Sequence, residues 1–151
     1  MGIYLKHGDL KGAATLEDHE AWIDVSSFQW GVEVPTAQKG QAQVGHRVYS
    51  SFVVTKEVDS ATTGLMRCAA KNVVTPETFI DFISTSGAKS PYFSLTFKKV
   101  RVLGIDYYCA GAGVVETVRC FFESYEMTYR NLSASQGAPT SRMSFQDQAP
   151  L

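Results

Sequence analysis

Hydrophobic and polar residues alternate along most of this chain, and such alternation is typical of β-strands that bury one face. The alternation is concentrated in six segments rich in β-branched and aromatic residues: 3–7, 21–30, 48–58, 77–85, 92–108 and 116–130. Clusters of glycine, serine, asparagine and proline separate these segments and suit turns. The pattern therefore predicts a mainly β fold made of antiparallel strands.

Three of the longer segments change, once each, the face on which their apolar residues lie. Each change falls on a pair of polar residues: Ser26-Ser27, Lys98-Lys99 and Glu123-Ser124. Because side chains alternate with a period of two, the change requires either a β-bulge or a strand that leaves one sheet for another at a corner. Both alternatives bend the sheet, and bent strands allow a sheet to close. We therefore expect an antiparallel β-barrel of curved, bulged strands.

A single short helix is predicted after the third of these segments. Asp59 and Ser60 are suitable N-cap residues, and Leu65 and Cys68 follow at helical spacing. Gly64 lies within this helix and costs about 1 kcal/mol relative to alanine, so the helix depends on packing against the sheet. We expect it to cover one end of the barrel.

Two segments fall outside the strand pattern. Residues 31–45 contain three glycines, three glutamines and one proline, which predicts a long loop or an extended hairpin. Loops of this length in compact domains are commonly functional or disordered. Residues 133–151 are rich in serine, glutamine and proline, which predicts a C-terminal tail that is mobile or docks on a neighbouring subunit. Residues 1–132 are expected to form one domain.

Composition and charge restrict the function more than the fold. The 151 residues are 44% hydrophobic and 19% charged, and 14 Lys and Arg against 15 Asp and Glu give a net charge of −1. Nucleic acids and anionic membranes attract an excess of positive charge, which this chain does not have. A charged residue appears too soon after the start of the chain for the apolar core of a signal peptide. A run of about 18 apolar residues, as a membrane-spanning helix needs, is also not present. We expect neither a nucleic-acid partner nor membrane insertion.

Residues suited to catalysis or metal binding are not grouped in the sequence. The three cysteines show no Cys-x-x-Cys spacing and the three histidines no ligand spacing, so neither a metal nor another cofactor is expected. We interpret His19 as a residue that fixes a turn by hydrogen bonding. No nucleophile and base can be paired, and the aspartates within strands are interpreted as outward-facing: Asp24, Asp81 and Asp106. The chain is therefore not expected to be an enzyme.

Lys56 departs from the pattern of its strand. It shares the parity of Phe52, Val54 and Val58, so alternation turns its charge toward an apolar face. An inward charge can protect an edge strand from pairing with another chain, or it can pair with a carboxylate at a subunit contact. The sequence leaves both alternatives open.

Four blocks of sequence cover most of residues 1–131. They are Ile3-Tyr4-Leu5-Lys6 with Gly12, His19, Trp22-Ile23 and Ser26-Ser27-Phe28-Gln29-Trp30-Gly31; Phe52-Val53-Val54-Thr55-Lys56-Glu57-Val58-Asp59-Ser60-Ala61 with Leu65; Tyr92-Phe93-Ser94-Leu95-Thr96-Phe97-Lys98-Lys99-Val100; and Glu126-Met127-Thr128-Tyr129. In their order and spacing these blocks resemble the Hcp family, the tube proteins of bacterial type VI secretion systems.

The resemblance implies a structural subunit without catalytic activity. In the family, a β-barrel with a side helix assembles six to a ring, and the rings stack into a hollow inner tube. A sheath surrounds this tube, which is expelled together with the spike and effector proteins. The resemblance also implies assembly in the cytoplasm and then secretion to the exterior or into a target cell without a cleaved signal peptide.

Candidate contact residues follow from the same resemblance. Residues 31–45 match the family's long extended loop, which contacts a neighbouring ring or subunit. Lys56 and Asp59 match a Lys-x-x-Asp motif that we interpret as a folding or contact element. The candidate subunit contacts are therefore Gln38, Lys39, Gln41, Lys56 and Asp59.

Two other classes of function compete with the tube. One is a binding barrel that holds a small apolar molecule among Trp22, Phe28, Trp30 and Phe52, although barrels of this size are usually filled by their own side chains. The other is a hydrolase, which ranks last because no nucleophile and base can be placed together.

Overall fold

The fold is given by a computed structural model, which describes residues 1–34, 36–37, 41–42, 47–84, 90–131 and 140–146. Its elements are β1 (Gly2–His7), β2 (Ile23–Val25), β3 (Ser27–Gln29), β4 (Val32–Glu33), β5 (Thr36–Ala37), β6 (Gln41–Ala42), β7 (Val48–Tyr49), β8 (Phe52–Glu57), α1 (Thr62–Ala70), β9 (Thr75–Ile83), β10 (Pro91–Ala110), β11 (Gly113–Phe121), β12 (Ser124–Arg130) and β13 (Thr140–Gln146). The strands pair antiparallel, so the predicted mainly β, antiparallel fold with one short helix is confirmed.

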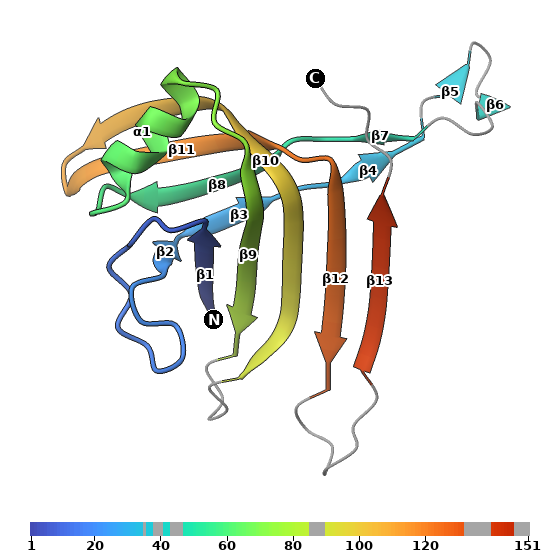
Figure 1. Cartoon of the computed structure of the whole chain (residues 1–151), viewed down its shortest axis with the longest axis horizontal. Coiled ribbons are helices and arrows are strands. Elements are labelled where there is room, and N and C mark those ends of the chain that lie inside the picture. Colours follow the sequence, from blue (N-terminus) through green and yellow to red (C-terminus); the bar gives the residue numbers. More distant parts are fainter. Residues whose placement is uncertain (35, 38–40, 43–46, 85–89, 132–139, 147–151) are drawn as a thin grey trace.

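The long strand β10 belongs to two halves of one curved sheet (Figure 1). Residues 91–100 lie between β9 and β12, whereas residues 101–110 pair with β11. The first half runs β2-β1-β9-β10-β12-β13, and the second runs β10-β11-β8-β3. The path of paired strands begins at β2 and ends at β3, and Ser26 alone joins these two strands in the chain. The sheet therefore wraps around a single core.

Each of the three predicted changes of face is a corner where the chain passes between the two halves. At Ser26 the chain passes from β2, which pairs with β1, into β3, which pairs with β8. At Lys99 the pairing partner of β10 changes from β12 to β11. After Phe121 the chain turns from β11, in the second half, into β12, in the first. Lys99 has a φ of 52°, which lies in the left-handed region. Its Nζ lies 3.3 Å from Glu123 Oε2, so an ion pair joins the last two corners.

Aromatic side chains fill the space between the halves. Phe52 and Phe97 stack with ring centroids 4.3 Å apart, and Phe122 lies 4.7 Å from Phe97. Trp30 packs edge-on against Phe97 and Tyr125 at 5.1 and 4.9 Å. Burial of apolar and aromatic side chains is the main favourable contribution to the free energy of folding. This cluster therefore holds the curved sheet together.

The four residues of the apolar-ligand alternative pack in two separate places. A cavity lined by residues of β1, β8, β11 and α1 has room for about one water molecule. Phe28 packs against Phe52, and Trp30 is in contact with the aromatic cluster. Trp22 lies elsewhere, with its ring 4.5 Å from that of His19. The four residues proposed to line a ligand site therefore do not enclose one.

The helix α1 lies across β10 and β11 at one end of the molecule (Figure 1). It begins slightly later than predicted, because its N-cap residue is Ala61, and Asp59 Oδ1 accepts a hydrogen bond from the Ala61 N–H at 2.8 Å. A Cβ on Gly64 would collide with the side chain of Leu10. The glycine therefore allows the loop after β1 to pack closely on the helix.

The strand pairs β4–β7 and β5–β6 form the described part of the extended hairpin that the sequence allowed. β4 pairs with β7 at its base, and β5 pairs with β6 farther out. In Figure 1 this hairpin projects from the body at the end of the molecule opposite α1. Val32, Val34 and Val48 at its base are exposed.

Part of the segment after residue 132 is a strand. β13 pairs with β12 along its whole length, from Arg130 opposite Thr140 to Ser124 opposite Gln146. Arg142 Nε donates a hydrogen bond to Glu126 Oε1 at 2.8 Å across the pair. Ser141, Arg142 and Met143 are exposed, so these residues of β13 extend the sheet without adding to the core.

Candidate functional site

The sequence singled out Lys56 for its inward charge, and the structure buries this residue completely. β8 carries Lys56 and lies between β11 and β3, so it is an inner strand of the sheet. The interpretation of Lys56 as a charge that protects an edge strand is therefore wrong. The other alternative was pairing with a carboxylate at a subunit contact, but the carboxylates that Lys56 meets belong to its own subunit.

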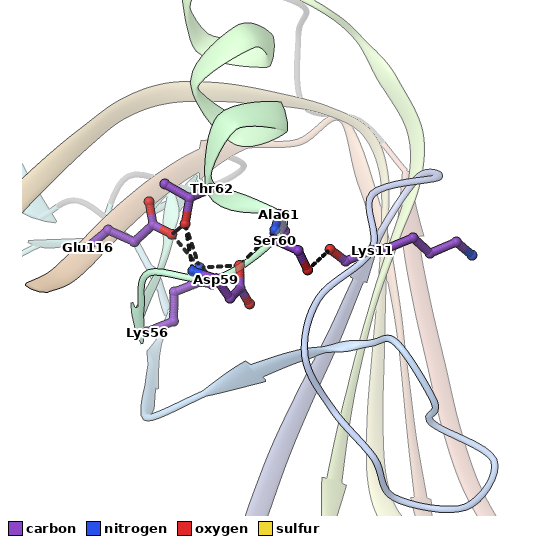
Figure 2. Close-up of polar contacts among 7 residues, drawn as sticks. All are labelled: Lys11, Lys56, Asp59, Ser60, Ala61, Thr62 and Glu116. Carbon is purple, nitrogen blue, oxygen red and sulfur yellow. Dashed lines mark hydrogen bonds and ion pairs between the residues drawn. The ribbon is translucent and has the colours of Figure 1, made fainter.

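Two carboxylates surround the Lys56 ammonium (Figure 2). Its Nζ forms an ion pair with Glu116 Oε1 and lies 3.0 Å from Asp59 Oδ1. Glu116 lies directly opposite Lys56 in the register of β8 and β11 and is also completely buried. We call Lys56, Asp59, Thr62 and Glu116 the charge cluster.

The charge cluster connects three elements of the fold. Thr62 Oγ1, in the first turn of α1, donates a hydrogen bond to Glu116 Oε1 at 2.8 Å and accepts one from the Asp59 N–H at 2.9 Å. Ser60 Oγ donates to the Lys11 carbonyl at 2.7 Å, which adds the loop after β1 (Figure 2). β8, β11 and the start of α1 are thereby held in one arrangement.

Negative charge exceeds positive charge within the cluster. One ammonium faces two carboxylates, and Glu116 Oε2 is buried with no hydrogen-bond partner among the described residues. Burial raises the pKa of Asp24, and the charge of Asp59 adds to this effect. Burial likewise raises the pKa of Tyr107, to which the charge of Glu116 and a hydrogen bond with it contribute.

The chemistry of this cluster is that of a structural ion pair. A buried carboxylate that loses its cation is costly, so the geometry is strongly fixed once it has formed. Within the residues that the structure describes, no group of three or more His, Cys, Asp and Glu side chains could hold a metal ion. Asp24 and Asp106 are exposed, as expected for outward-facing positions.

Of the remaining candidate contact residues, the structure describes Gln41. It is the first residue of β6, whereas Gln38 and Lys39 lie outside the described residues. β6 and α1 are at opposite ends of the molecule (Figure 1), so one subunit does not bring Gln41 together with Lys56 and Asp59. The three described candidates therefore fall into two separate regions.

Two histidines are buried and hydrogen-bonded. His19 Nε2 donates to Asp81 Oδ2 at 2.8 Å and so ties the loop before β2 to β9, which agrees with its predicted role in fixing a turn. His7 lies between Thr78 Oγ1 at 2.7 Å and Thr75 Oγ1 at 2.9 Å. Burial lowers the pKa of His7 from 6.5 to about 4.

Sequence reasoning missed Glu116 and Thr62. Glu116 shares the parity of the buried Val118 and Cys120, and this shared parity was a signal that its carboxylate points inward. Thr62 carried no such signal, because only the fold brings the start of α1 onto β11.

Comparison with protein families identifies one match, described as "Type VI secretion system effector, Hcp", over residues 4–129. Comparison with individually characterised proteins gives no significant match. The described part of the chain contains no helix with the length and apolar character needed to cross a bilayer.

Solved structures of similar fold cover nearly the whole chain. One, titled as a type six secretion system protein, has a TM-score of 0.84 and 21% identity and covers 96% of this chain and 94% of its own. A variant of Hcp1 from E. coli EAEC 042 has a TM-score of 0.81 and 22% identity, with 95% and 97% covered. Hcp1 from Salmonella typhimurium has a TM-score of 0.80 and 17% identity, with 96% and 93% covered.

Proposed function

Because this chain belongs to the Hcp family of type VI secretion systems, we propose that its copies form hexameric rings that stack into the hollow inner tube of the secretion apparatus. The family match over residues 4–129 carries this proposal. It spans the charge cluster, the extended hairpin and every strand from β3 to β11.

The extended hairpin supports assembly rather than binding of a small molecule. The core of the subunit is filled by its own aromatic residues, and the hairpin projects beyond it with exposed valines at its base. A projecting β-hairpin loses backbone entropy and gains little burial within its own subunit, so a second copy is the natural source of the missing contacts. Gln38, Lys39 and Gln41 are the proposed contacts.

Lys56 and Asp59 are proposed to support assembly from inside the subunit. Both belong to the charge cluster that fixes α1 against β8 and β11. A rigid subunit surface costs less ordering entropy when two copies associate. Their role is therefore to shape a contact surface.

The tube requires partners and a route out of the cell. The proposed partners are further copies of the chain, the secretion sheath, the spike and effector proteins carried with the tube. The subunit assembles in the cytoplasm and leaves with the expelled tube, so a cleaved signal peptide is not part of the route.

Size-exclusion chromatography with light scattering tests ring formation directly. At micromolar concentration the full chain is expected to elute with the mass of six subunits, and negative-stain images should show rings. Monomers or dimers alone at high concentration would contradict the proposal. Deletion of residues 38–43 is expected to leave rings that no longer stack, and loss of the rings themselves would place this segment within the ring.

A further inference from the structure

Near the β10–β11 turn, the strands of the second half extend past the core. Side chains on their core-facing side are therefore exposed there. Glu116 is completely buried on this side, but Val58, Tyr107 and Val114, which share its parity and register, are 44%, 44% and 37% exposed. Cys109, opposite Val114, is exposed as well. We call Val58, Tyr107, Cys109 and Val114 the turn patch.

The inner border of the turn patch is the charge cluster. Among the described residues its one ammonium, that of Lys56, faces the carboxylates of Asp59 and Glu116. Glu57 and Asp106 are exposed on the other side of the same strands. A surface that presents apolar side chains together with a positive charge would fit this end of the subunit.

The base of the extended hairpin presents such a surface. Val32 lies opposite Tyr49 in the pairing of β4 and β7, and alternation puts Val34 and Arg47 on the same side as these two. Val32 and Val34 are 54% and 42% exposed, and Arg47 is exposed as well. Glu33 points to the opposite side, because it pairs with Val48. We call Val32, Val34 and Arg47 the base patch.

The two patches cannot meet within one subunit. In Figure 1 the β10–β11 turn lies at one end of the longest axis of the molecule, and the β4–β7 pair lies toward the other end. A contact between them has to join two copies head to tail, and such a heterologous contact closes into a ring when its rotation permits. The base patch also adjoins the body, where a subunit packed alongside can reach it.

Resting on the proposed function, we propose that the base patch of one subunit docks on the turn patch of its neighbour in the same ring. Val32 and Val34 cover Tyr107 and Val114, and Arg47 lies toward the acidic border of the turn patch. The occupant of this apolar surface is thus a second copy of the chain.

Two single substitutions on opposite patches test the contact by mixing. Val114→Asp puts a charge into the turn patch and leaves the base patch intact. Val32→Asp puts a charge into the base patch and leaves the turn patch intact. Each variant alone is expected to be monomeric, with its half-assembly concentration raised at least tenfold over wild type. An equimolar mixture retains one good pair of surfaces, so it is expected to form heterodimers and nothing larger. Variants that still form rings, or a mixture that forms no heterodimer, would overturn the proposal.

A matched pair of tyrosines in β10 tests which face of the β10–β11 turn makes the contact. Tyr107 and Tyr108 are neighbours and both exposed, but only Tyr107 lies on the side of the turn patch. Tyr107→Ala should weaken ring formation severalfold while Tyr108→Ala leaves it unchanged, with circular dichroism confirming the fold of both. Equal effects would contradict docking on this side.

Labelling of Cys109 reports on the turn patch without any substitution in that patch. Cys109 is exposed in the isolated subunit, whereas Cys68 and Cys120 are buried and burial raises their pKa. Alkylation of Cys109 in wild-type rings should be at least tenfold slower than in the Val32→Asp monomer. Equal rates would overturn the contact while leaving ring formation intact, whereas a wild-type chain that never forms rings would overturn the proposed function as well.

Discussion

The ion pairs of Lys56 fix the positions of β8, β11 and α1 relative to one another. Its ammonium is completely buried, and the only charges that the structure places against it are the carboxylates of Glu116 and Asp59. Ions in such a site are stable only together, because the desolvation of each is offset by the others. Removing the cation therefore has a larger effect than removing an exposed charge.

Lys56→Met is expected to destabilise the subunit by about 3–5 kcal/mol, because it leaves two buried carboxylates without their cation. Urea unfolding measured on dilute protein gives the change in free energy. Lys99→Met is the matched control, since Lys99 is 67% exposed and its pair with Glu123 should contribute less than about 1 kcal/mol. Equal losses in the two variants would show that the charge cluster is not structural.

His7 predicts a dependence of stability on pH. Burial lowers its pKa from 6.5 to about 4 in the folded chain, so between these values the unfolded chain binds more protons. Stability should therefore fall as the pH drops from 6.5 toward 4, by up to about 3 kcal/mol from this group. An NMR titration of the His7 imidazole should give a midpoint near 4, and a midpoint near 6.5 would contradict the prediction.

At the scale of elements, alternation predicted strands and corners but not their partners. The changes of face at Ser26-Ser27, Lys98-Lys99 and Glu123-Ser124 are visible in the sequence because each strand faces the same core on both sides of its corner. The sequence does not show that β10 is shared by two halves, since strand order depends on contacts between distant segments. For the same reason Lys56 could be predicted to point inward while its partner Glu116 could not.

The close contact of Gly64 with Leu10 gives a prediction for α1. Gly64→Ala improves helix propensity by about 1 kcal/mol, but the added methyl group collides with the Leu10 side chain. Overpacking of this kind costs about 1–3 kcal/mol, so the variant should be neutral to destabilised in urea unfolding. In a Leu10→Ala background the same substitution should become stabilising. Stabilisation in both backgrounds would contradict the contact.

The strand β13 gives a prediction about the extent of the domain. Ser141, Arg142 and Met143 of β13 are exposed, and the Arg142 and Glu126 side chains of its ion pair are 69% and 28% exposed. Deletion of residues 133–151 should therefore leave a folded domain, with about 1–3 kcal/mol lost from cross-strand pairs with β12. Circular dichroism and urea unfolding would measure this, and loss of the cooperative transition would show that residues 1–132 are not sufficient.

At the scale of the whole molecule, the shared strand β10 makes the two halves depend on each other. Residues 91–100 complete the first half and residues 101–110 the second, so unfolding one half removes a strand from its neighbour. A small domain of this kind is expected to unfold in one cooperative transition.

Trp22 and Trp30 can report on this cooperativity separately. Trp22 lies beside His19 at the edge of the first half, whereas Trp30 packs in the aromatic cluster between the halves. Fluorescence of Trp22→Phe and of Trp30→Phe should each match the circular dichroism transition of the same variant. Separate transitions within one variant would show that the halves unfold independently.

The extended hairpin projects from only one end of the subunit, and this has a consequence for growth. In a stack whose rings all face the same way, one mouth of the tube displays the free hairpins and the other displays the surface that receives them. The two mouths are therefore chemically different, and a protein that caps one leaves the other open. In the proposed tube, subunits would therefore add to the two mouths at different rates, and this difference follows from the shape of a single chain.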